Sequence, residues 1–231
     1  MPKEMIKAIV LAGGSGRRMG GNCKKQYMLL AGRPILYYSL QTFQDSCVDE
    51  IILVTNEAEY CWTELVHKYN LGKVTKIVPG GQERWNSVYS GLLAAEPCSY
   101  ILIHDGARPM LTQTMIEDSV TAVRTYSACV IGMPVKDTIK IADDEKFAVQ
   151  TPPRETLWQI QTPQTFSYPL IVQAYQKILE QHPRGITDDA MVLEYAMHTK
   201  VKLIQGSYRN IKITTPEDIV IAEAMMHIQL E

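Results

Sequence analysis

The sequence predicts an α/β domain with a mostly parallel, twisted β-sheet flanked by helices, and with one protruding β-hairpin arm. Short apolar segments alternate with segments of helical periodicity from residue 7 to residue 133. The apolar segments are nearly continuous, which is typical of parallel strands that are covered on both faces. The alternation breaks at Pro134, where short alternating segments surround a polar turn. These three observations carry the prediction.

The repeated pattern sets the order of the expected elements. Strands are expected at 7–11, 50–55, 74–78, 100–104 and 128–133, and helices at 35–43, 58–69, 85–95 and 115–126. Ligands of such sheets bind beyond the carboxyl ends of the strands. The loops after the first, third and fourth strands are chemically unusual, so we expect one functional site where they meet.

Residues 134–158 are predicted to form the arm. The short runs at 138–141 and 147–151 flank a polar turn at 143–146. An arm with apolar residues and no core of its own usually packs on a second subunit. We therefore expect a homodimer that forms through the arm; a flap folded back on its own chain is the alternative.

The C-terminal part resumes the alternation. Helices are expected at 170–180 and 187–197, a strand at 201–205 and a last helix from Pro216. Thr215 before this proline and two acids after it are typical of a helix start. The length of 231 residues is in keeping with one domain over residues 1–231.

The composition excludes several classes of function. A formal net charge of −2 does not favour binding to nucleic acid or to an anionic membrane, and no apolar run reaches the roughly 18 residues of a membrane span. The five cysteines are widely spaced and form no C-x-x-C pair, which indicates reduced thiols. The N-terminus has no signal-peptide pattern, so we expect a cytoplasmic protein.

A glycine-rich loop over residues 12–25 follows the first expected strand. It contains five glycines and four cations, Arg17, Arg18, Lys24 and Lys25. Glycine leaves backbone N–H groups able to face an anion, and the cations can neutralise a polyphosphate. The loop matches neither G-x-x-x-x-G-K-[ST] nor G-x-G-x-x-G. We therefore expect it to hold a nucleoside triphosphate; a basic βα turn without a ligand is the alternative.

Asp105 ends the fourth expected strand, next to this loop. A carboxylate beside a polyphosphate is a natural Mg²⁺ ligand, because Mg²⁺ takes few protein carboxylates together with phosphate oxygens. An aspartate that caps the following turn is the alternative. His104 is interpreted as a structural imidazole, since a phosphate nucleophile is already ionised and needs no general base.

Other candidates are weaker on their own. Ser87 follows a glycine turn that can read the polar edge of a base, or that simply opens a helix. Lys212 alternates with two isoleucines on an expected short strand, where a solvent-facing lysine is the alternative. The remaining polar residues read by themselves as turn and cap residues: Thr138 and Arg154 on the arm, a Thr162-Pro163-Gln164 turn, and Thr187-Asp188-Asp189.

Several motifs in order resemble a known family. They are AGGSGRRM at 12–19, KQY at 25–27, GGxxRxxSV from Gly80, HDGARP from His104, PVKDTIK from Pro134, LWxxQTPQ from Leu157, TDDA from Thr187 and NIK from Asn210. In these motifs, which cover nearly the whole chain, the sequence is similar to the 2-C-methyl-D-erythritol 4-phosphate cytidylyltransferases of the non-mevalonate isoprenoid pathway. The resemblance implies a Rossmann-like nucleotidyltransferase domain.

The resemblance also implies a reaction and a cofactor. The phosphate of methylerythritol phosphate attacks the α-phosphorus of CTP in line, and pyrophosphate leaves. Such a transfer needs positioning and charge neutralisation more than covalent catalysis. The family pattern makes Mg²⁺ the cofactor and Asp105 its ligand.

The resemblance gives roles to individual residues. The residues expected to stabilise the developing charge are Arg18, Lys25 and Lys212. The residues expected to bind the nucleotide are Ala12, Gly13, Gly14, Gly16, Gly81, Arg84, Ser87, Asp105 and Ala107. The residues expected to bind the polyol phosphate are Arg108, Thr162, Thr187 and Lys212, with Thr138 and Arg154 reaching from the arm of a partner subunit.

Two alternatives stay open from the sequence. A ribitol-5-phosphate cytidylyltransferase has the same fold and chemistry, and a non-catalytic nucleotide-binding regulator is the alternative from another class. The chain also departs from the family pattern. Gly106 stands where other members carry alanine, which we expect to be neutral, and no metal or polar role is transferred to Arg209 because some members carry aspartate there.

Overall fold

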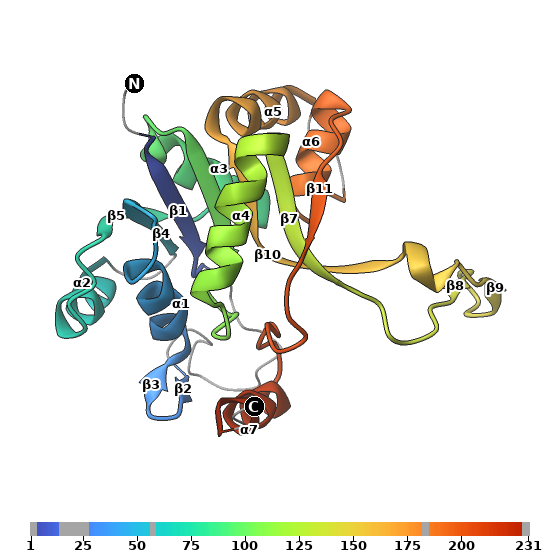
Figure 1. The fold of residues 1–231 in the computed structure, drawn as a ribbon, viewed down its shortest axis with the longest axis horizontal. Coiled ribbons are helices and arrows are strands. Elements are labelled where there is room, and N and C mark those ends of the chain that lie inside the picture. Colours follow the sequence, from blue (N-terminus) through green and yellow to red (C-terminus); the bar gives the residue numbers. More distant parts are fainter. Residues whose placement is uncertain (1–3, 14–27, 56–58, 182–184, 228–231) are drawn as a thin grey trace.

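A seven-stranded β-sheet runs through the middle of the molecule (Figure 1). This computed structural model describes residues 4–13, 28–55, 59–181 and 185–227. In those residues the strand order is β11-β7-β10-β6-β1-β4-β5. The strands are β1 (Ile6–Leu11), β4 (Glu50–Thr55), β5 (Val74–Pro79), β6 (Tyr100–Asp105), β7 (Ala128–Pro134), β10 (Trp158–Ser167) and β11 (Lys202–Gln205).

Parallel pairing dominates this sheet. β1 pairs in parallel with β4 and β6, β4 pairs in parallel with β5, and β11 pairs in parallel with β7. Among the described strands of this seven-stranded sheet, only β10 runs antiparallel to its neighbours. The predicted fold class and all six predicted strands of the sheet are therefore confirmed, and the carboxyl ends of β1, β5 and β6 share one edge.

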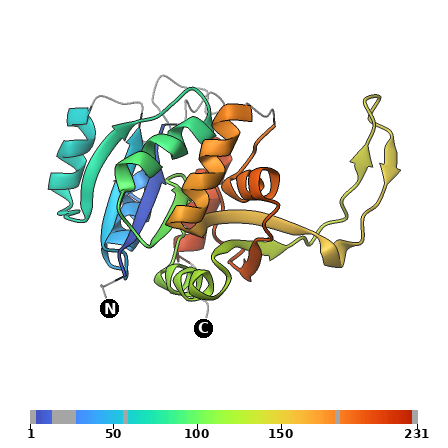
Figure 2. The same cartoon turned by 90° about the horizontal axis from the view of Figure 1, so that it is seen from above.

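Helices cover both faces of the sheet, as Figures 1 and 2 show. Helices α1 (Ile35–Gln44), α2 (Glu59–Lys68) and α4 (Gln113–Tyr126) pack on one face, and α3 (Arg84–Ala95), α5 (Tyr168–Gln181) and α6 (Asp189–Met197) pack on the other. In β1, Ala8 and Val10 join the first core while Ile9 joins the second, because successive strand residues point to opposite faces. No helix in the described ranges is long and apolar enough to cross a membrane.

A third, smaller core closes the edge below the carboxyl ends of the strands. It joins β2 (Leu29–Leu30) and the start of α1, which follows the short strand β3 (Arg33–Pro34), to helix α7 (Pro216–His227). The buried residues of this core are Leu30, Ile35, Ile213 and Ala222. The predicted helix start at Pro216 is confirmed. At this helix start the Asp218 carboxylate, in the first turn, reaches back and accepts hydrogen bonds from the backbone N–H groups of Thr214 and Thr215.

The predicted turn at Thr162-Pro163-Gln164 is wrong. These residues lie within β10, the central antiparallel strand, where its register with β7 shifts between Ile160 and Gln164. A proline cannot donate to the ladder, and it is tolerated in a strand at such an irregularity. Because of this proline and the polar residues around it, the segment lacks the apolar pattern by which strands are predicted from sequence.

The predicted arm leaves the body between β7 and β10 and reaches far from the sheet (Figure 2). Strands β8 (Ile141–Ala142) and β9 (Ala148–Gln150) pair antiparallel, and the 3₁₀ helix η3 (Arg154–Thr156) stands at the return to the body. The hairpin is confirmed, although its strands are shorter than the expected runs. Phe147 and Val149 on the arm are 66% and 61% exposed, so the arm buries little of its own apolar surface.

Candidate active site

A pocket of about 260 Å³ opens beside the carboxyl end of β6. Six residues that the sequence singled out line it, namely Arg84, Asp105, Arg108, Thr162, Thr187 and Lys212. Four further lining residues were not predicted as site residues, namely Ile160, Gln161, Gln164 and Asp188. These residues come from α3, β6 and its loop, β10, the start of α6 and the segment before α7, so the fold gathers them from distant parts of the chain.

Asp105 is the anionic centre of the pocket. Lys212 Nζ donates to its Oδ2 at 2.7 Å, Arg84 Nε lies 3.5 Å from Oδ1, and Arg108 Nε lies 4.0 Å from Oδ2. Burial disfavours the charged carboxylate, but Arg84 and Lys212 outweigh burial and hold the pKa of Asp105 well below its usual range. Asp105 is therefore ionised across the physiological range, inside a ring of cations.

The position of Lys212 is set by a backbone hydrogen bond of the next residue, Ile213, and not by pairing in a β-strand. The expected short strand around Lys212 is wrong, because the segment before α7 joins no sheet in the described structure. Instead, the buried Ile213 donates its N–H to the carbonyl of Ala107 at 2.9 Å, which holds the segment against the loop after β6. The Lys212 side chain is 40% exposed and turns toward Asp105.

Four residues behind the pocket form a closed hydrogen-bonded ring. Thr162 Oγ1 lies 3.0 Å from His104 Nδ1, His104 Nε2 lies 3.3 Å from the carbonyl of Arg108, Arg108 Nη1 donates to the carbonyl of Asn210 at 2.8 Å, and Asn210 Nδ2 donates to the carbonyl of Thr162 at 3.0 Å. Thr162 Oγ1 also accepts the N–H of Asp105 at 3.1 Å. The ring ties β10, the loop after β6 and the segment before α7 together.

His104 fits this ring as a neutral imidazole. It is completely buried, and burial lowers its pKa to about 4, against the opposing effect of Asp105. With Thr162 donating to Nδ1, the proton sits on Nε2 and points to the carbonyl of Arg108. The interpretation of His104 as a structural imidazole agrees with this arrangement.

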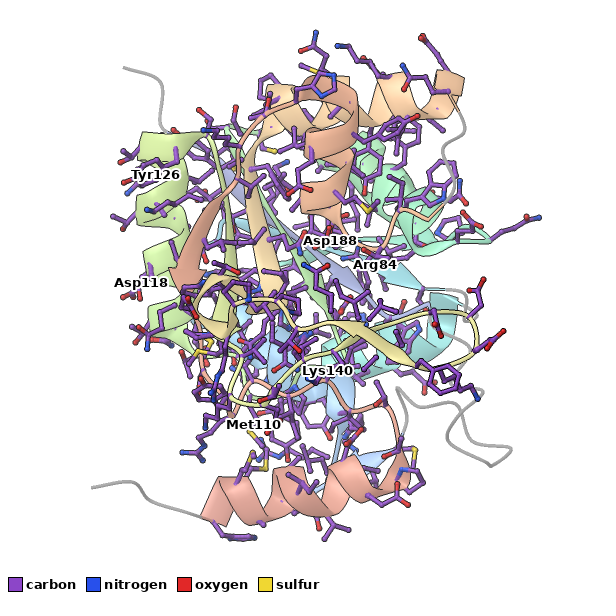
Figure 3. The ribbon with its side chains drawn as sticks, turned by 90° about the vertical axis from the view of Figure 1, so that its right-hand side faces the viewer. Arg84, Met110, Asp118, Tyr126, Lys140 and Asp188 are labelled. Atoms are coloured by element: carbon purple, nitrogen blue, oxygen red, sulfur yellow. The ribbon has the colours of Figure 1, made fainter. Side chains whose placement is uncertain are left out.

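Arg84 is held by an acid that was not predicted as a site residue. Its Nη1 and Nη2 donate to Oδ1 and Oδ2 of Asp189 at 2.9 and 2.7 Å, and Asp189 is completely buried. Figure 3 shows Arg84 from α3 and Asp188 from the start of α6 at the same rim. Two successive acids at a helix start were the available signal: Asp188 caps α6 by accepting from the N–H of Met191, which leaves Asp189 for another role.

The residues predicted to bind the nucleotide base lie at the same edge of the sheet. Ala12 follows β1 and is buried, and its N–H donates to the carbonyl of Val54 at 2.7 Å. The N–H of Gly81 donates to Ser87 Oγ at 3.0 Å, so this N–H is used within the turn. A Cβ at Gly81 would lie 2.2 Å from Asn86 Cβ, hence the turn requires glycine. The predicted residues Gly14, Gly16, Arg18 and Lys25 lie outside the described residues.

The structure explains the two departures from the family pattern. A Cβ on Gly106 would lie 2.6 Å from Leu36 Cδ1 and 3.0 Å from the carbonyl oxygen of Leu11, so an alanine there would require the Leu36 side chain to shift. The Arg209 guanidinium donates to the carbonyl of Met225 in the last turn of α7. Arg209 thus satisfies one of the carbonyls that a helix leaves unpaired at its C-terminus.

The two predicted site residues on the arm do not join the pocket. Thr138 and Arg154 are exposed, and Arg154 Nη1 donates to the carbonyl of Lys136 at the root of the arm. Within one described chain these residues therefore make no part of the pocket wall, and the predicted role for them requires a second subunit.

Asp105 and Asp188 are the two carboxylates that line this pocket among the described residues, and Asp105 is the candidate for a hard cation. The described residues contain no cluster of three or more His, Cys, Asp or Glu side chains that could hold a metal alone. Asp188 is occupied by Gln164 and by the N–H of Met191. The donor set fits Mg²⁺ only with most ligands coming from phosphate and water, which is how this ion commonly binds.

The pocket can therefore bind and polarise a phosphate-rich ligand. Arg84, Arg108 and Lys212 surround a single ionised acid, and the Nε atom of Arg108 is buried without a hydrogen-bond partner among the described residues. An unpaired buried donor is costly unless a ligand accepts from it. Positioned cations of this kind stabilise charge that develops during phosphoryl transfer.

Comparisons with known proteins agree with this chemistry. The family model described as 2-C-methyl-D-erythritol 4-phosphate cytidylyltransferase matches residues 6–228. The enzyme of that name from Lachnospira eligens is 51% identical over 222 residues, covering 94% of this chain and 97% of the relative. The one from Alkaliphilus oremlandii is 47% identical over 229 residues, covering 96% and 95%.

A solved structure shares the fold as well as the sequence. The crystal structure of 4-diphosphocytidyl-2C-methyl-D-erythritol synthase from Anaerococcus prevotii matches with a TM-score of 0.86 and 36% identity, and covers 97% of each chain. The match of the family model over nearly the whole chain is supported by close relatives and by this structure. The chain therefore belongs to the 2-C-methyl-D-erythritol 4-phosphate cytidylyltransferase family.

Proposed function

We propose that this chain transfers the cytidylyl group of CTP to 2-C-methyl-D-erythritol 4-phosphate, giving 4-diphosphocytidyl-2-C-methyl-D-erythritol and pyrophosphate in isoprenoid precursor biosynthesis. The observation that carries the proposal is the pocket at the end of β6, where Arg84, Arg108 and Lys212 surround Asp105. Family membership supplies the identity of the two substrates.

The reaction makes one bond and breaks one. A phosphate oxygen of the polyol phosphate attacks the α-phosphorus of CTP, and the bond to the bridging oxygen of pyrophosphate breaks with its electron pair leaving on that oxygen. The nucleophile is already an anion, so no general base is required. The buried His104, whose pKa is about 4, is neutral and hydrogen-bonded on both nitrogens, in keeping with a reaction that does not use it as a base.

Arg108 and Lys212 are proposed to bind the phosphate that attacks. The unpartnered Nε of Arg108 offers a donor in the pocket, and the exposed part of Lys212 can move between Asp105 and an incoming anion. Thr162 and Thr187 line the same pocket and are proposed to bind the polyol phosphate. Arg18 and Lys25, outside the described residues, are proposed to neutralise the triphosphate together with Lys212.

Asp105 is proposed to hold Mg²⁺ when CTP is bound. The ion would supply charge neutralisation on the phosphate oxygens. The contribution of this chain is an ionised carboxylate kept at the edge of β6 by Arg84 and by the N–H contact of Asp105 to Thr162.

The arm is proposed to form a homodimer and to bring Thr138 and Arg154 into the pocket of the partner subunit. The exposed apolar side chains Phe147 and Val149 support this proposal, since they need a covering surface. The reduced-thiol pattern of the cysteines supports a cytoplasmic location.

Pyrophosphate release tests the proposed function directly. The full chain is incubated with CTP and Mg²⁺, with methylerythritol 4-phosphate and ribitol 5-phosphate in parallel. We expect release with methylerythritol 4-phosphate alone. Release only with ribitol 5-phosphate would move the chain to the ribitol enzymes, and CTP binding without release with either would favour a nucleotide-binding regulator.

A further inference from the structure

The start of α6 holds a buried acid that none of the proposed catalytic steps uses. Asp189 is completely buried and accepts two hydrogen bonds from Arg84 and one from Tyr175, whose hydroxyl donates to Oδ1 at 2.6 Å. Its backbone N–H donates to Gln164 Oε1 on β10 at 2.9 Å. The carboxylate and the N–H of Asp189 therefore both point into the protein, and the carboxylate can reach a ligand only through Arg84.

The partners of Asp189 are fixed by packing and by hydrogen bonds. Tyr175 is completely buried on α5 and stacks against Tyr89 of α3 with ring centroids 6.3 Å apart, and both rings pack with the core on that face of the sheet. A two-point Arg–carboxylate pair has a fixed, planar geometry. The guanidinium of Arg84 thus has one orientation available, with Nη1 and Nη2 turned to Asp189 and Nε turned to Asp105.

This geometry determines the protonation state of Arg84 and the part of its guanidinium that faces Asp105. Burial opposes the positive charge of Arg84, but Asp189 and then Asp105 outweigh burial and raise its pKa well above the usual value. Because both terminal nitrogens are occupied, Arg84 presents only its edge to Asp105. Lys212 therefore keeps the short contact with Asp105, at 2.7 Å against 3.5 Å for Arg84.

We infer that Asp189 is a positioning residue that keeps the terminal nitrogens of Arg84 away from Asp105, so that Lys212, and not Arg84, is the cation paired with Asp105 beside the reacting phosphates. Without the charge of Asp189, Arg84 would turn its free nitrogens to Asp105, the nearest remaining acid, and displace Lys212. This inference rests on the proposed function and deepens it. It also revises the role of Arg84, which was predicted to bind nucleotide and which the clamp by Asp189 makes a bridge between two acids.

The test compares CTP binding with turnover in variants of the full-length protein. Asp189→Asn keeps the size of the side chain and removes its charge. We expect kcat to fall at least tenfold while the Kd for CTP, measured by calorimetry, stays within threefold or becomes tighter, because the pocket gains free positive charge. A merely structural residue would weaken binding and turnover together and lower the melting temperature in proportion, and that result would overturn the inference.

Coupling to Arg84 is the second readout. Adding Asp189→Asn to Arg84→Met should change kcat less than threefold, because the acid has no guanidinium left to hold. Losses that multiply in the double variant would overturn the inference. Glu194→Gln removes an exposed acid from the same helix and should leave kcat unchanged.

Tyr175→Phe covers the case in which Asp189→Asn does not fold. It removes one hydrogen bond to Asp189 and keeps the ring, and we expect kcat to fall three- to tenfold with CTP binding retained. Unchanged turnover in a folded Tyr175→Phe protein would overturn the inference. If the unaltered protein releases no pyrophosphate with either polyol phosphate, the proposed function fails first; if it is active and both variants equal it, only the inference fails.

Discussion

The pocket and the arm are opposites in the way that they hold their polar and apolar groups. Around the pocket, His104, Asp189 and Asn210 are completely buried, and each is hydrogen-bonded to a residue far away in the sequence. On the arm, Phe147 and Val149 are mostly exposed. The described residues of one chain pair the buried polar groups behind the pocket with one another, whereas the arm exposes large apolar side chains to solvent.

The base of the arm is attached to the scaffold of the pocket by side-chain contacts. Lys136 Nζ lies 3.5 Å from the centre of the Tyr208 ring, and the Tyr208 hydroxyl donates to the carbonyl of Pro134 at 2.8 Å. These contacts anchor the arm to the segment that also carries Asn210 and Lys212. The comparison teaches that the arm is fixed at its base by the active-site scaffold while its far end remains available to a second surface.

Removing Lys212 should have the largest effect and should break the pocket alone. Lys212→Met removes the ammonium that contacts Asp105, and loss of one such group costs about 10²- to 10³-fold in kcat. Steady-state pyrophosphate release measures the loss. The matched control is Lys202→Met, an exposed lysine on β11, which should keep full activity. A Lys212→Met protein with kcat within threefold of the unaltered protein would remove Lys212 from the mechanism.

Lowering the pH should reduce the free energy of unfolding through the protonation of His104. Its pKa is about 4 in the folded protein, against 6.5 for the ordinary group. The unfolded chain therefore binds more protons between these values, and the stabilising effect of the neutral imidazole, present above pH 6.5, is lost as the pH falls toward 4. The full effect is about 3 kcal/mol.

Urea unfolding at pH 7.0, 5.5 and 4.5 in metal-free buffer measures this effect, with His104→Gln as the variant that cannot titrate. The difference in unfolding free energy between the two proteins should shrink as the pH falls. Asp105 does not interfere, because its lowered pKa removes stability only below about pH 4. Parallel curves for the two proteins would show that His104 does not titrate on unfolding.

Breaking the arm should leave the scaffold intact. Phe147→Asp places a charge on its most exposed large apolar side chain. We expect the proposed dimer to dissociate in sedimentation velocity and activity to fall about tenfold, because Thr138 and Arg154 would no longer reach a partner's pocket. The thermal unfolding of the single chain should stay unchanged. Val220→Asp, at a 68% exposed position on α7, is the matched control. Dimers of normal stability in Phe147→Asp would refute the role of the arm.

The smallest effect is expected at the rim of the pocket. Gly81→Ala would place a Cβ 2.2 Å from Asn86 Cβ, so the turn before α3 must shift. Overpacking of this kind costs about 1–3 kcal/mol, and the KM for CTP should rise about fivefold. Gly72→Ala meets no atom within 4 Å and should be neutral in both thermal unfolding and kinetics. Equal behaviour of the two variants would mean that the turn adapts freely.

The sequence by itself determined the elements and the chemical character of the site. Continuous apolar runs identified the parallel strands, and the loop beginning with His104 and Asp105 was recognised as functional, because periodicity and strand-end polarity are local properties of the chain. Six predicted site residues line one pocket for this reason, although their individual roles stay predictions.

Only the tertiary structure decided the partners of those residues. Lys212 meets Asp105 across 107 positions, and Arg84 meets Asp189 across 105. Both contacts depend on β10 entering the sheet between β6 and β7, and Pro163 concealed that strand. A local pattern states which residues can carry charge, but strand order sets which charges come together, and that order is a property of the whole packed chain.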